Sequence, residues 1–468
     1  MKSIKKNAVL NTIQTLMKII FPLITFPYVS RILGVNELGK YNYSNSIAGY
    51  YVLCASLGIA TYAVREGAQI RDDKKKIENF AKNIFSINIY STILATIILG
   101  LCLFFIRNLN PYRSIIIILS IQAIFETLGR NWLYSIYENY LYITLRSILF
   151  QFISMILMFL FVKDRSDVMV YAGITAFSVI GNNLVNIVAG QKICKTKFTF
   201  FPELKCLIPI ILIFSTSLSI IIYSNSDITI LGIFGTDYNV GLYSVSVKIY
   251  CIVKQLIAAI LTVSIPRFSY LIGKNLIYDY NTLFKKIFNI LILILLPISV
   301  GLFMLSKECI YLLSGSDYIK ASISLKILSV AMIFNLVAYM FGYCVLIPYK
   351  SEMVFFVSTL ISAFINIVLN LFFIPFYMEN AAAATTLIAE LMNTIICFIS
   401  AKKYVHFKGV FRNLVCGLIG CMWIIICCFL VSKTFKNIIS RTVISVILSG
   451  IGYIVLQLII NTKELKNL

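Results

Sequence analysis

Fourteen apolar runs, each close to 20 residues long, follow one another along the chain with short polar breaks. A helix of about 20 apolar residues crosses a bilayer core of about 30 Å. In lipid every backbone polar group needs a partner within the protein, and a helix satisfies its own. The pattern predicts an all-α polytopic membrane protein. The predicted spans are 7–30, 41–63, 81–106, 113–134, 140–162, 168–190, 205–225, 239–264, 284–306, 322–347, 353–375, 380–401, 411–431 and 440–460.

Basic residues indicate the orientation of these spans. Lys2, Lys5 and Lys6 precede the first run, and no small-residue cleavage site follows it, so we expect a retained helix and not a signal peptide. With the N-terminus in the cytoplasm, most Lys and Arg fall on the cytoplasmic side, and an even number of spans returns the C-terminus there. The basic stretch 65–82 then faces the anionic inner leaflet. The net charge of +22 therefore requires no nucleic-acid partner.

The sequence lacks the residues that several kinds of chemistry require. Twelve cysteines lie mostly in apolar spans without a CxxC pair, and the single histidine, His406, lies in a basic loop. The stretch 34–41, GVNELGKY, nearly fits a phosphate-binding P-loop, but Tyr41 replaces the hydroxyl that holds magnesium. No outer loop is long enough for a folded domain. We predict no enzymatic activity, no cofactor and no metal, and transport driven by a gradient or by the substrate's own concentration difference.

Two halves of the chain echo each other. The stretches 31–47, RILGVNELGKYNYSNSI, and 229–249, TILGIFGTDYNVGLYSVSVKI, share Ile-Leu-Gly, a later Gly-x-Tyr and small polar residues. A second echo pairs YENYLYITLRSI with YKSEMVFFVSTLI. The offsets predict two six-helix repeats around a central cavity, related by an axis along the membrane normal. We expect an N-lobe at 1–190, a basic cytoplasmic linker at 191–204, a C-lobe at 205–405, and two peripheral helices with a tail at 406–468.

Polar residues recur at three- and four-residue steps in several spans, which places them on one helix face. These stripes include Asn11 and Gln14 in the first span, Asn186 in the sixth, and Asn366 and Asn370 in the eleventh. Polar faces cannot point at lipid, so they face other helices or a watery cavity. Interhelical hydrogen bonding would explain any one of them. Their presence in both halves favours a shared cavity lining.

Four lysines fall well inside predicted spans, where a charge costs at least about 2.5 kcal/mol. Lys326 begins its span and can snorkel to the interface. Lys18 lies on the polar stripe and Lys248 on a polar face, so we expect both in the cavity, whereas Lys254 points about 120° away from Lys248. Arg31, at the predicted outer mouth, is either an interfacial snorkelling residue or a fork-shaped donor suited to phosphate.

Three acids lie within or at the ends of spans, and each is a candidate for ion coupling. Glu126 and Arg130 align at four-residue spacing, so they could simply neutralise each other. Asp227 ends a polar stripe at the outer mouth. Glu390 has no basic neighbour in its own helix, so it either binds a proton or cation or pairs with a lysine from another helix.

Two prolines interrupt the first span. Pro22 and Pro27 each remove a backbone donor, and we expect a kink at both. Bent helices with polar stripes suit a structure that opens alternately to each side.

At these residues the chain resembles the Wzx-type O-antigen and capsule repeat-unit flippases, a polysaccharide transporter family of the multidrug/oligosaccharidyl-lipid/polysaccharide exporter superfamily. The stretch 22–68, which begins PLITFPYVSRILGVNELGKY, looks like that family's N-terminal signature. The stretches 131–139, NWLYSIYEN, and 366–390, NIVLNLFFIPFYMENAAAATTLIAE, look like later ones. The likeness covers nearly the whole chain. One departure is ENAAAATT, where relatives usually show Gly before Ala-Ala.

The resemblance implies a fourteen-helix, two-lobed transporter in the bacterial cytoplasmic membrane. Such a protein moves an undecaprenyl-pyrophosphate-linked oligosaccharide to the outer leaflet, for O-antigen or other surface polysaccharide. We expect the pyrophosphate to meet Lys18, Arg31 and Lys248, with Lys254 as a further candidate, while the prenyl tail stays in lipid. A proton or sodium counter-ion and a polysaccharide polymerase complex are candidate partners.

Three other functions compete with this interpretation. A cation-coupled drug exporter of the same superfamily would favour acids over bases in the cavity. A lipid II flippase is close in substrate but lacks support from these signatures. A membrane glycan polymerase or ligase usually carries a substantial outer loop, which this chain does not have.

Overall fold

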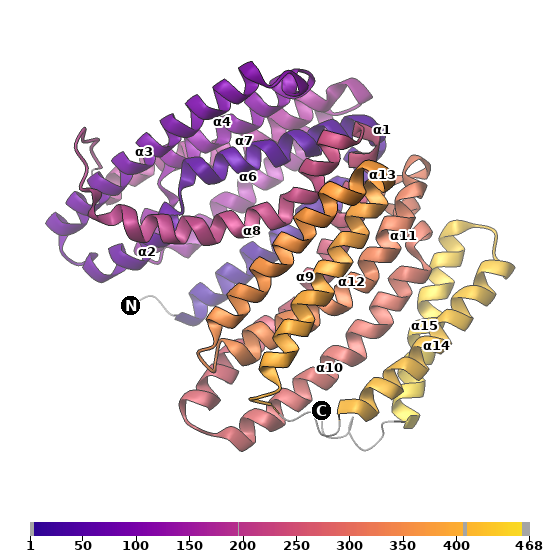
Figure 1. Ribbon diagram of the computed structural model, residues 1–468. Helices are drawn as coiled ribbons and strands as arrows, with labels where there is room; N and C mark the ends of the chain where they lie inside the picture. Colours follow the sequence, from indigo (N-terminus) through magenta and orange to yellow (C-terminus); the bar gives the residue numbers. More distant parts are fainter. Residues whose placement is uncertain (1–3, 195, 406–409, 461–468) are drawn as a thin grey trace. The chain divides into compact units, whose positions relative to one another are not determined.

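The computed structural model describes residues 4–194, 196–405 and 410–460. This part of the chain is built from helices and contains no strand (Figure 1). Short 3-10 and π segments join or extend the α-helices. The α-helices are α1 (Ile4–Ser56), α2 (Ile59–Ile70), α3 (Lys74–Phe105), α4 (Arg113–Gly129), α5 (Asn131–Ile136), α6 (Tyr140–Phe161), α7 (Val168–Ile193), α8 (Leu207–Phe234), α9 (Asp237–Gly273), α10 (Ile277–Met304), α11 (Ser306–Ser314), α12 (Ser322–Met340), α13 (Glu352–Ala401), α14 (Val410–Thr434) and α15 (Ile438–Ile460).

Twelve helical stretches in the described residues are long and apolar enough to cross a membrane. Two of them are each interrupted by a residue with non-helical dihedral angles, Gly34 in α1 and Met378 in α13. Division at these two residues leaves fourteen helices. The predicted all-α polytopic fold with fourteen spans is confirmed, and the chain is a multi-pass membrane protein.

The connection between the first two spans differs from the prediction. Residues 31–40 were expected to link two helices, but they are helical on both sides of Gly34, which has φ 72° and ψ 177°. A positive φ is favourable for glycine because it has no Cβ. Pro22 and Pro27 lie inside the helix before Gly34, and the backbone stays helical at both. The break in α1 therefore falls at the glycine and not at the prolines.

Residues 1–241 form one compact unit and residues 242–468 a second. In the first unit, α7 packs against α4 and α6, and α1 packs against the same two helices. One core joins these four helices through side chains such as Val29, Leu119, Met158 and Ala172. The boundary of the units at Gly241 places α8 in the first unit. The predicted division into repeats at 191–204 stays a prediction from the sequence offsets.

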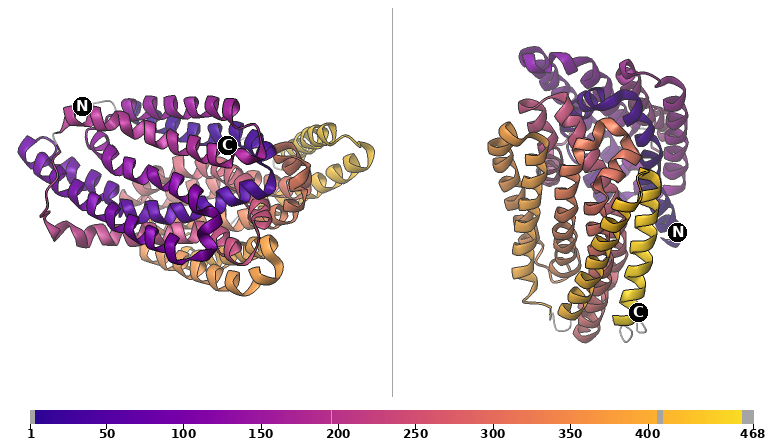
Figure 2. Two further views of the ribbon diagram at one scale, coloured as in Figure 1. Left: turned by 90° about the horizontal axis from the view of Figure 1, so that it is seen from above. Right: turned by 90° about the vertical axis from the view of Figure 1, so that its right-hand side faces the viewer.

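The second unit is centred on α10, α12 and α13. α12 packs against both α10 and α13, and α14 packs against α10 and α15. The helices α14 and α15, drawn in yellow, run side by side in Figures 1 and 2. The Tyr453 hydroxyl of α15 donates to the Leu293 carbonyl of α10 at 2.8 Å, and Gln457 Nε2 donates to the Cys416 carbonyl of α14 at 2.8 Å. The last two helices therefore form an addition to the second unit, held by α10.

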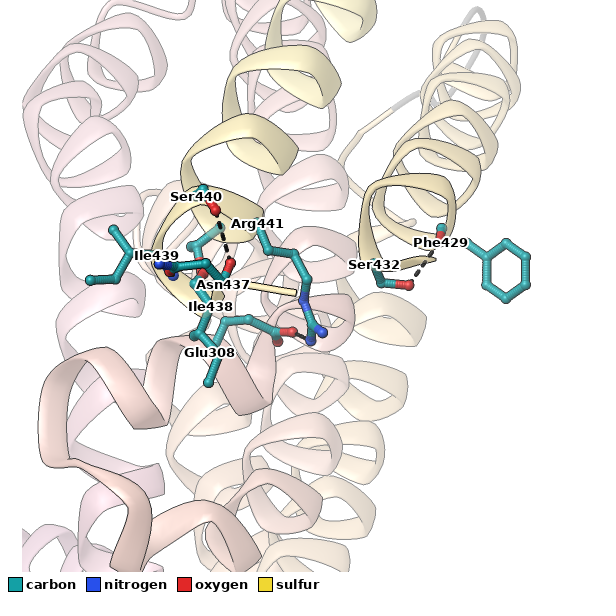
Figure 3. Close-up of polar contacts among 9 residues, drawn as sticks. Glu308, Phe429, Ser432, Asn437, Ile438, Ile439, Ser440 and Arg441 are labelled. Carbon is teal, nitrogen blue, oxygen red and sulfur yellow. Dashed lines mark hydrogen bonds and ion pairs between the residues drawn. The ribbon is translucent and has the colours of Figure 1, made fainter. Parts of the chain in front are cut away.

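An ion pair fixes the beginning of α15. Figure 3 shows Arg441 reaching from α15 to the carboxylate of Glu308 on α11. The Glu308 residue is only 3% exposed, so its charge depends on this partner. Asn437 caps the same end of α15, because its side-chain oxygen accepts from the backbone N–H of Ile439 at 2.9 Å. The pair and the cap together hold the short connection between α14 and α15.

Candidate functional site

A buried polar cluster in the first unit joins α5, α6 and α7. Its centre is Asn131, whose side-chain oxygen accepts hydrogen bonds from Arg146 Nη2 at 2.9 Å and from Asn186 Nδ2. Asn131 Nδ2 in turn donates to Asn183 Oδ1 at 2.8 Å, and Arg146 Nε donates to Asn182 Oδ1. We call these five residues the amide cluster. Asn186, predicted to lie on a polar stripe, is fully buried in it.

The geometry of the amide cluster follows from its sequence. Asn182, Asn183 and Asn186 lie within little more than one turn of α7, so their side chains leave that helix on neighbouring faces. Gly129 allows the close approach of Asn183, because a Cβ at this glycine would lie 2.4 Å from Asn183 Oδ1. The helix α7 can therefore pack tightly against the end of α4, where Asn131 begins α5.

Arg130 lies next to the amide cluster and turns the chain from α4 into α5. It has a left-handed backbone with φ 46° and ψ 48°, which ends α4. Its guanidinium donates from Nε to the Leu128 carbonyl at 3.1 Å and from Nη2 to the Ile187 carbonyl at 3.4 Å. The expected pairing with Glu126 is absent among the described residues. The reason is local, because the left-handed turn takes Arg130 off the helical face that carries Glu126.

Two tyrosines cover the guanidinium of Arg146. The rings of Tyr134 and Tyr142 stack with centroids 4.9 Å apart. Arg146 Cζ lies 5.6 Å from the Tyr134 ring centroid and 5.0 Å from that of Tyr142. Cation–π attraction is strongest where water is excluded, and Arg146 is 5% exposed. The aromatic pair and the amide oxygens thus take the place of water around a charge inside the helix bundle.

The polar stripe of the first span approaches this site along α6. Gln14 Nε2 donates to Ser147 Oγ at 3.4 Å, one residue after Arg146. One turn earlier, the Thr144 hydroxyl donates to the Leu10 carbonyl at 3.3 Å. The polar stripe of the first span therefore contacts α6, the helix that the polar stripe of the sixth span also contacts. Lys18 and Asn11 belong to α1, but their side chains lie outside the described part of the structure.

The other predicted cations lie on two helices. Arg31 is exposed, on α1 of the first unit, three residues before Gly34. Lys248 and Lys254 are both half-buried on α9, in the second unit. Lys254 Nζ lies 4.8 Å from the centroid of the Tyr250 ring one turn earlier, which gives its charge a local partner. That these cations meet in one cavity remains a prediction.

The predicted carboxylates are in three different environments. Glu126 is half-buried on α4. Asp227 is 9% exposed on α8, two residues before Thr229, whose hydroxyl donates to Ser46 Oγ on α1 at 3.2 Å. Glu390, at 2% exposed, accepts a hydrogen bond from Asn335 Nδ2 at 2.7 Å. Of the three, Glu390 is the most deeply buried.

The predicted asparagines of the second half form an interhelical network. Asn370 Nδ2 donates to Asn366 Oδ1 at 3.1 Å within the first half of α13. Thr385, in the second half of α13, donates to Asn370 Oδ1. Asn366 is 1% exposed and Asn370 is fully buried. The Thr385 contact is an interhelical hydrogen bond, which the sequence pattern left open as the alternative to a cavity lining.

A very close helix crossing explains the Gly-x-Tyr echo. A Cβ at Gly39 would lie 1.8 Å from the carbonyl oxygen of Asp237, and a Cβ at Gly241 would lie 2.1 Å from that of Val35. The two glycines begin the echoed Gly-x-Tyr of each half, and each makes room for the other's helix. Side chains continue the contact, since Tyr112 donates to Asp237 Oδ1 at 2.7 Å. The shared glycine is thus needed for packing.

Sequence reasoning overlooked Arg146 and considered Arg130 only as a possible partner of Glu126. Only lysines were counted as cations within spans, yet Arg146 lies six residues inside the span 140–162 and Arg130 inside 113–134. The position of Arg146 was a usable signal, because an arginine at that depth is costly unless it is paired. The role of Asn131 had no comparable signal, since its partners come from two other helices.

The fold belongs to a known class of membrane transporters. The structure matches the Lipid II flippase MurJ in an inward closed conformation with a TM-score of 0.78, over 98% of this chain and all of that one, at 17% identity. A multidrug resistance MATE family transporter of the MOP superfamily, in an outward-facing conformation, matches with a TM-score of 0.55 over 84% of this chain and 93% of that one, at 16% identity. The chain thus shares its fold with these two transporters.

The sequence defines the family. Residues 4–272, more than half of the chain, match the model of the family described as "Polysaccharide biosynthesis protein". The chain belongs to this family. It is also 24% identical over 392 residues to the "Putative O-antigen transporter" of Escherichia coli (strain K12), covering 83% of this chain and 94% of that protein.

Proposed function

We propose that this protein is a flippase that moves undecaprenyl-pyrophosphate-linked oligosaccharide from the inner to the outer leaflet of the bacterial cytoplasmic membrane. The observation that carries the proposal is the family match over residues 4–272, because it ties a MOP superfamily fold to polysaccharide synthesis. The O-antigen transporter similarity over 83% of the chain supports the same substrate class. O-antigen, capsule or another surface glycan would be the final product.

The proposed mechanism is alternating access with cationic residues at the pyrophosphate. Lys18, Arg31, Lys248 and Lys254 would attract the two phosphates, because each is a cation in or beside a membrane span. Gln14, and Asn11 on the same predicted stripe, would line the path of the sugars. The prenyl tail would stay in lipid. The protein would act with both termini in the cytoplasm.

Ion coupling is a separate part of the proposal. Glu126, Asp227 and Glu390 are the candidate groups for a proton or sodium ion. The deep burial of Glu390 and its amide partner Asn335 support it as the first to test. Transport by Glu390→Gln that no longer responds to collapse of the ion gradient would support coupling there, whereas an unchanged response would remove it.

The direct test measures the side of the membrane on which the lipid-linked glycan lies. In cells depleted of the protein, the glycan should accumulate on the inner leaflet, and re-expression should reverse this. A Lys18→Ala/Lys248→Ala variant should fail to restore transport at matched abundance. Lys326→Ala is the control, since Lys326 Nζ lies over the Phe303 ring, 5.4 Å from its centroid. Normal delivery of the glycan to the outer leaflet in depleted cells that have no redundant flippase would refute the proposal. Drug resistance on overexpression would favour the alternative of a cation-coupled drug exporter.

A further inference from the structure

Two buried arginines in the first unit have no acidic partner in the part of the chain that the structure describes. Arg130 is 2% exposed and Arg146 is 5% exposed. Their hydrogen bonds go to the carbonyls of Leu128 and Ile187 and to the side chains of the amide cluster, all of which are neutral. Within residues 4–194, 196–405 and 410–460, neither arginine forms an ion pair. Two positive charges thus lie inside one helix bundle with no negative charge to offset them.

Each guanidinium also keeps an unused donor. Nη1 of Arg130 and Nη1 of Arg146 are buried and make no hydrogen bond to any described residue. A buried donor without a partner is costly, and a charged one more so. The side-chain oxygen of Asn186 is likewise without a partner among these residues. The site therefore has unused hydrogen-bonding groups for one more ligand, and most of these groups belong to cationic side chains.

Both arginines lie close to Tyr134 of α5. A Cβ at Gly190 would lie 3.7 Å from Arg130 Nη2 and 3.8 Å from the Tyr134 hydroxyl oxygen. Arg146 Cζ lies 5.6 Å from the ring centroid of the same tyrosine. Tyr134 thus approaches both cations, with its hydroxyl near Arg130 and its ring beside Arg146, and Gly190 leaves the space of a methyl group next to the hydroxyl. A hydroxyl donor near guanidinium groups is an arrangement that suits an oxyanion with several acceptor oxygens.

We propose that Arg130, Arg146 and Tyr134 form an anion site within the first unit that binds a phosphate or pyrophosphate group. Guanidinium groups recognise phosphate oxygens through paired N–H donors, and the low dielectric of the bundle strengthens the attraction. None of these three residues is among the predicted cations Lys18, Arg31, Lys248 and Lys254. The anion site goes beyond the proposed transport function, because binding there can be measured without transport.

The segment that carries the site is a short helix set off by sharp turns at both ends. α5 has only six residues and is bounded by two non-glycine residues with positive φ, Arg130 at 46° and Glu138 at 54°. Such residues separate helices by sharp turns, so α5 is joined to α4 and α6 by non-helical joints. Because Arg130 and Tyr134 are buried, the proposal requires a small displacement of α5 to admit a ligand.

Tryptophan fluorescence provides a direct measurement. The chain has two tryptophans, and Trp132 follows Asn131 and is 4% exposed. In a Trp423→Phe background, the purified full chain in detergent should show a saturable fluorescence change with inorganic pyrophosphate at constant ionic strength. Arg146→Gln should weaken binding about tenfold or more. The control Arg65→Gln removes an exposed arginine paired with Glu66 at 2.8 Å and should leave the affinity unchanged.

Gly190→Ala keeps the test decisive if Arg146→Gln does not fold. Its new methyl group would meet Arg130 and Tyr134 at ordinary contact distances, so the fold should be retained while the space beside the cations is filled. Loss of pyrophosphate binding in a folded Gly190→Ala protein would support the site. Wild-type affinity in both variants, or no saturable binding by the wild type, would overturn it and leave the arginines a structural role.

A competition arm identifies the source of the phosphate group. Undecaprenyl pyrophosphate in nanodiscs that displaces inorganic pyrophosphate would assign the site to the lipid headgroup. Binding of the inorganic ion without such competition would assign it to a free anion. Both results uphold the site. Failure of the flippase assay together with pyrophosphate binding would refute the transport proposal while leaving this one intact.

Discussion

Replacing Gly39 with alanine should force apart the crossing of α1 and the start of α9. The new Cβ would lie 1.8 Å from the Asp237 carbonyl oxygen, whereas ordinary contact begins near 3.4 Å. The obstacle is backbone, so no side-chain rotation can relieve it. Overpacking of this kind costs about 1–3 kcal/mol. For a unit of 150–250 residues that corresponds to a fall in melting temperature of about 2–12 °C.

Thermal unfolding of the detergent-solubilised full chain, at one scan rate for all variants, measures this effect. Gly241→Ala should show a similar loss, because its Cβ would lie 2.1 Å from the Val35 carbonyl oxygen. Gly100→Ala in α3 is the matched control, since no atom lies within 4 Å of its added methyl group. If Gly39→Ala melted at the same temperature as Gly100→Ala, the close crossing would not be a feature of the folded protein, and our reasoning on the echoed glycines would fail.

Three further changes test other contacts. Arg441→Met should lower stability by about 3 kcal/mol, because it leaves the buried Glu308 carboxylate without its partner; a double variant with Glu308→Gln should recover part of the loss in thermal melts. Tyr453→Phe removes the hydroxyl that donates to α10 and should cost about 1 kcal/mol in the same assay; no change would mean that α15 is held by apolar packing alone. The backbone N–H and the ammonium of Lys76 lower the pKa of Asp73, the cap of α3, from its ordinary 3.8. The cap therefore stabilises the fold above pH 3.8 and loses this effect as the pH falls through the lowered pKa. The melting-temperature difference between wild type and Asp73→Asn should shrink as the pH falls below 3.8. A difference that stays constant would contradict the role of the Asp73 carboxylate as the cap.

The spans could be predicted well because their signal is local. The apolar runs at 113–134, 140–162 and 440–460 correspond to α4 with α5, to α6 and to α15 within a few residues. The join between spans one and two could not, because a single glycine with positive φ turns the chain while both sides remain helical. Residue type alone does not distinguish such a glycine from one that lies within a regular helix.

The same contrast between local pattern and tertiary contact applies to the polar residues. Stripes at three- and four-residue steps correctly identified Asn186, Asn366 and Asn370 as residues that face the protein interior. The pairing of Glu126 with Arg130, one of two alternatives for Glu126, does not form among the described residues, because α4 ends before residue 130. The amide cluster was not foreseen, since it requires side chains from α5, α6 and α7 to meet.

The sequence by itself determined that the chain is a multi-pass helical membrane protein, where most of its helices lie, and to which family it belongs. Those properties depend on the length and polarity of contiguous runs and on motifs within them, which are written along one dimension. Only the tertiary structure decided which polar groups meet. It placed Asn131 between Arg146 and Asn183, set Gly39 against the start of α9, and left two arginines without an acid. Such contacts join segments far apart in the chain, so packing determines them and local pattern does not.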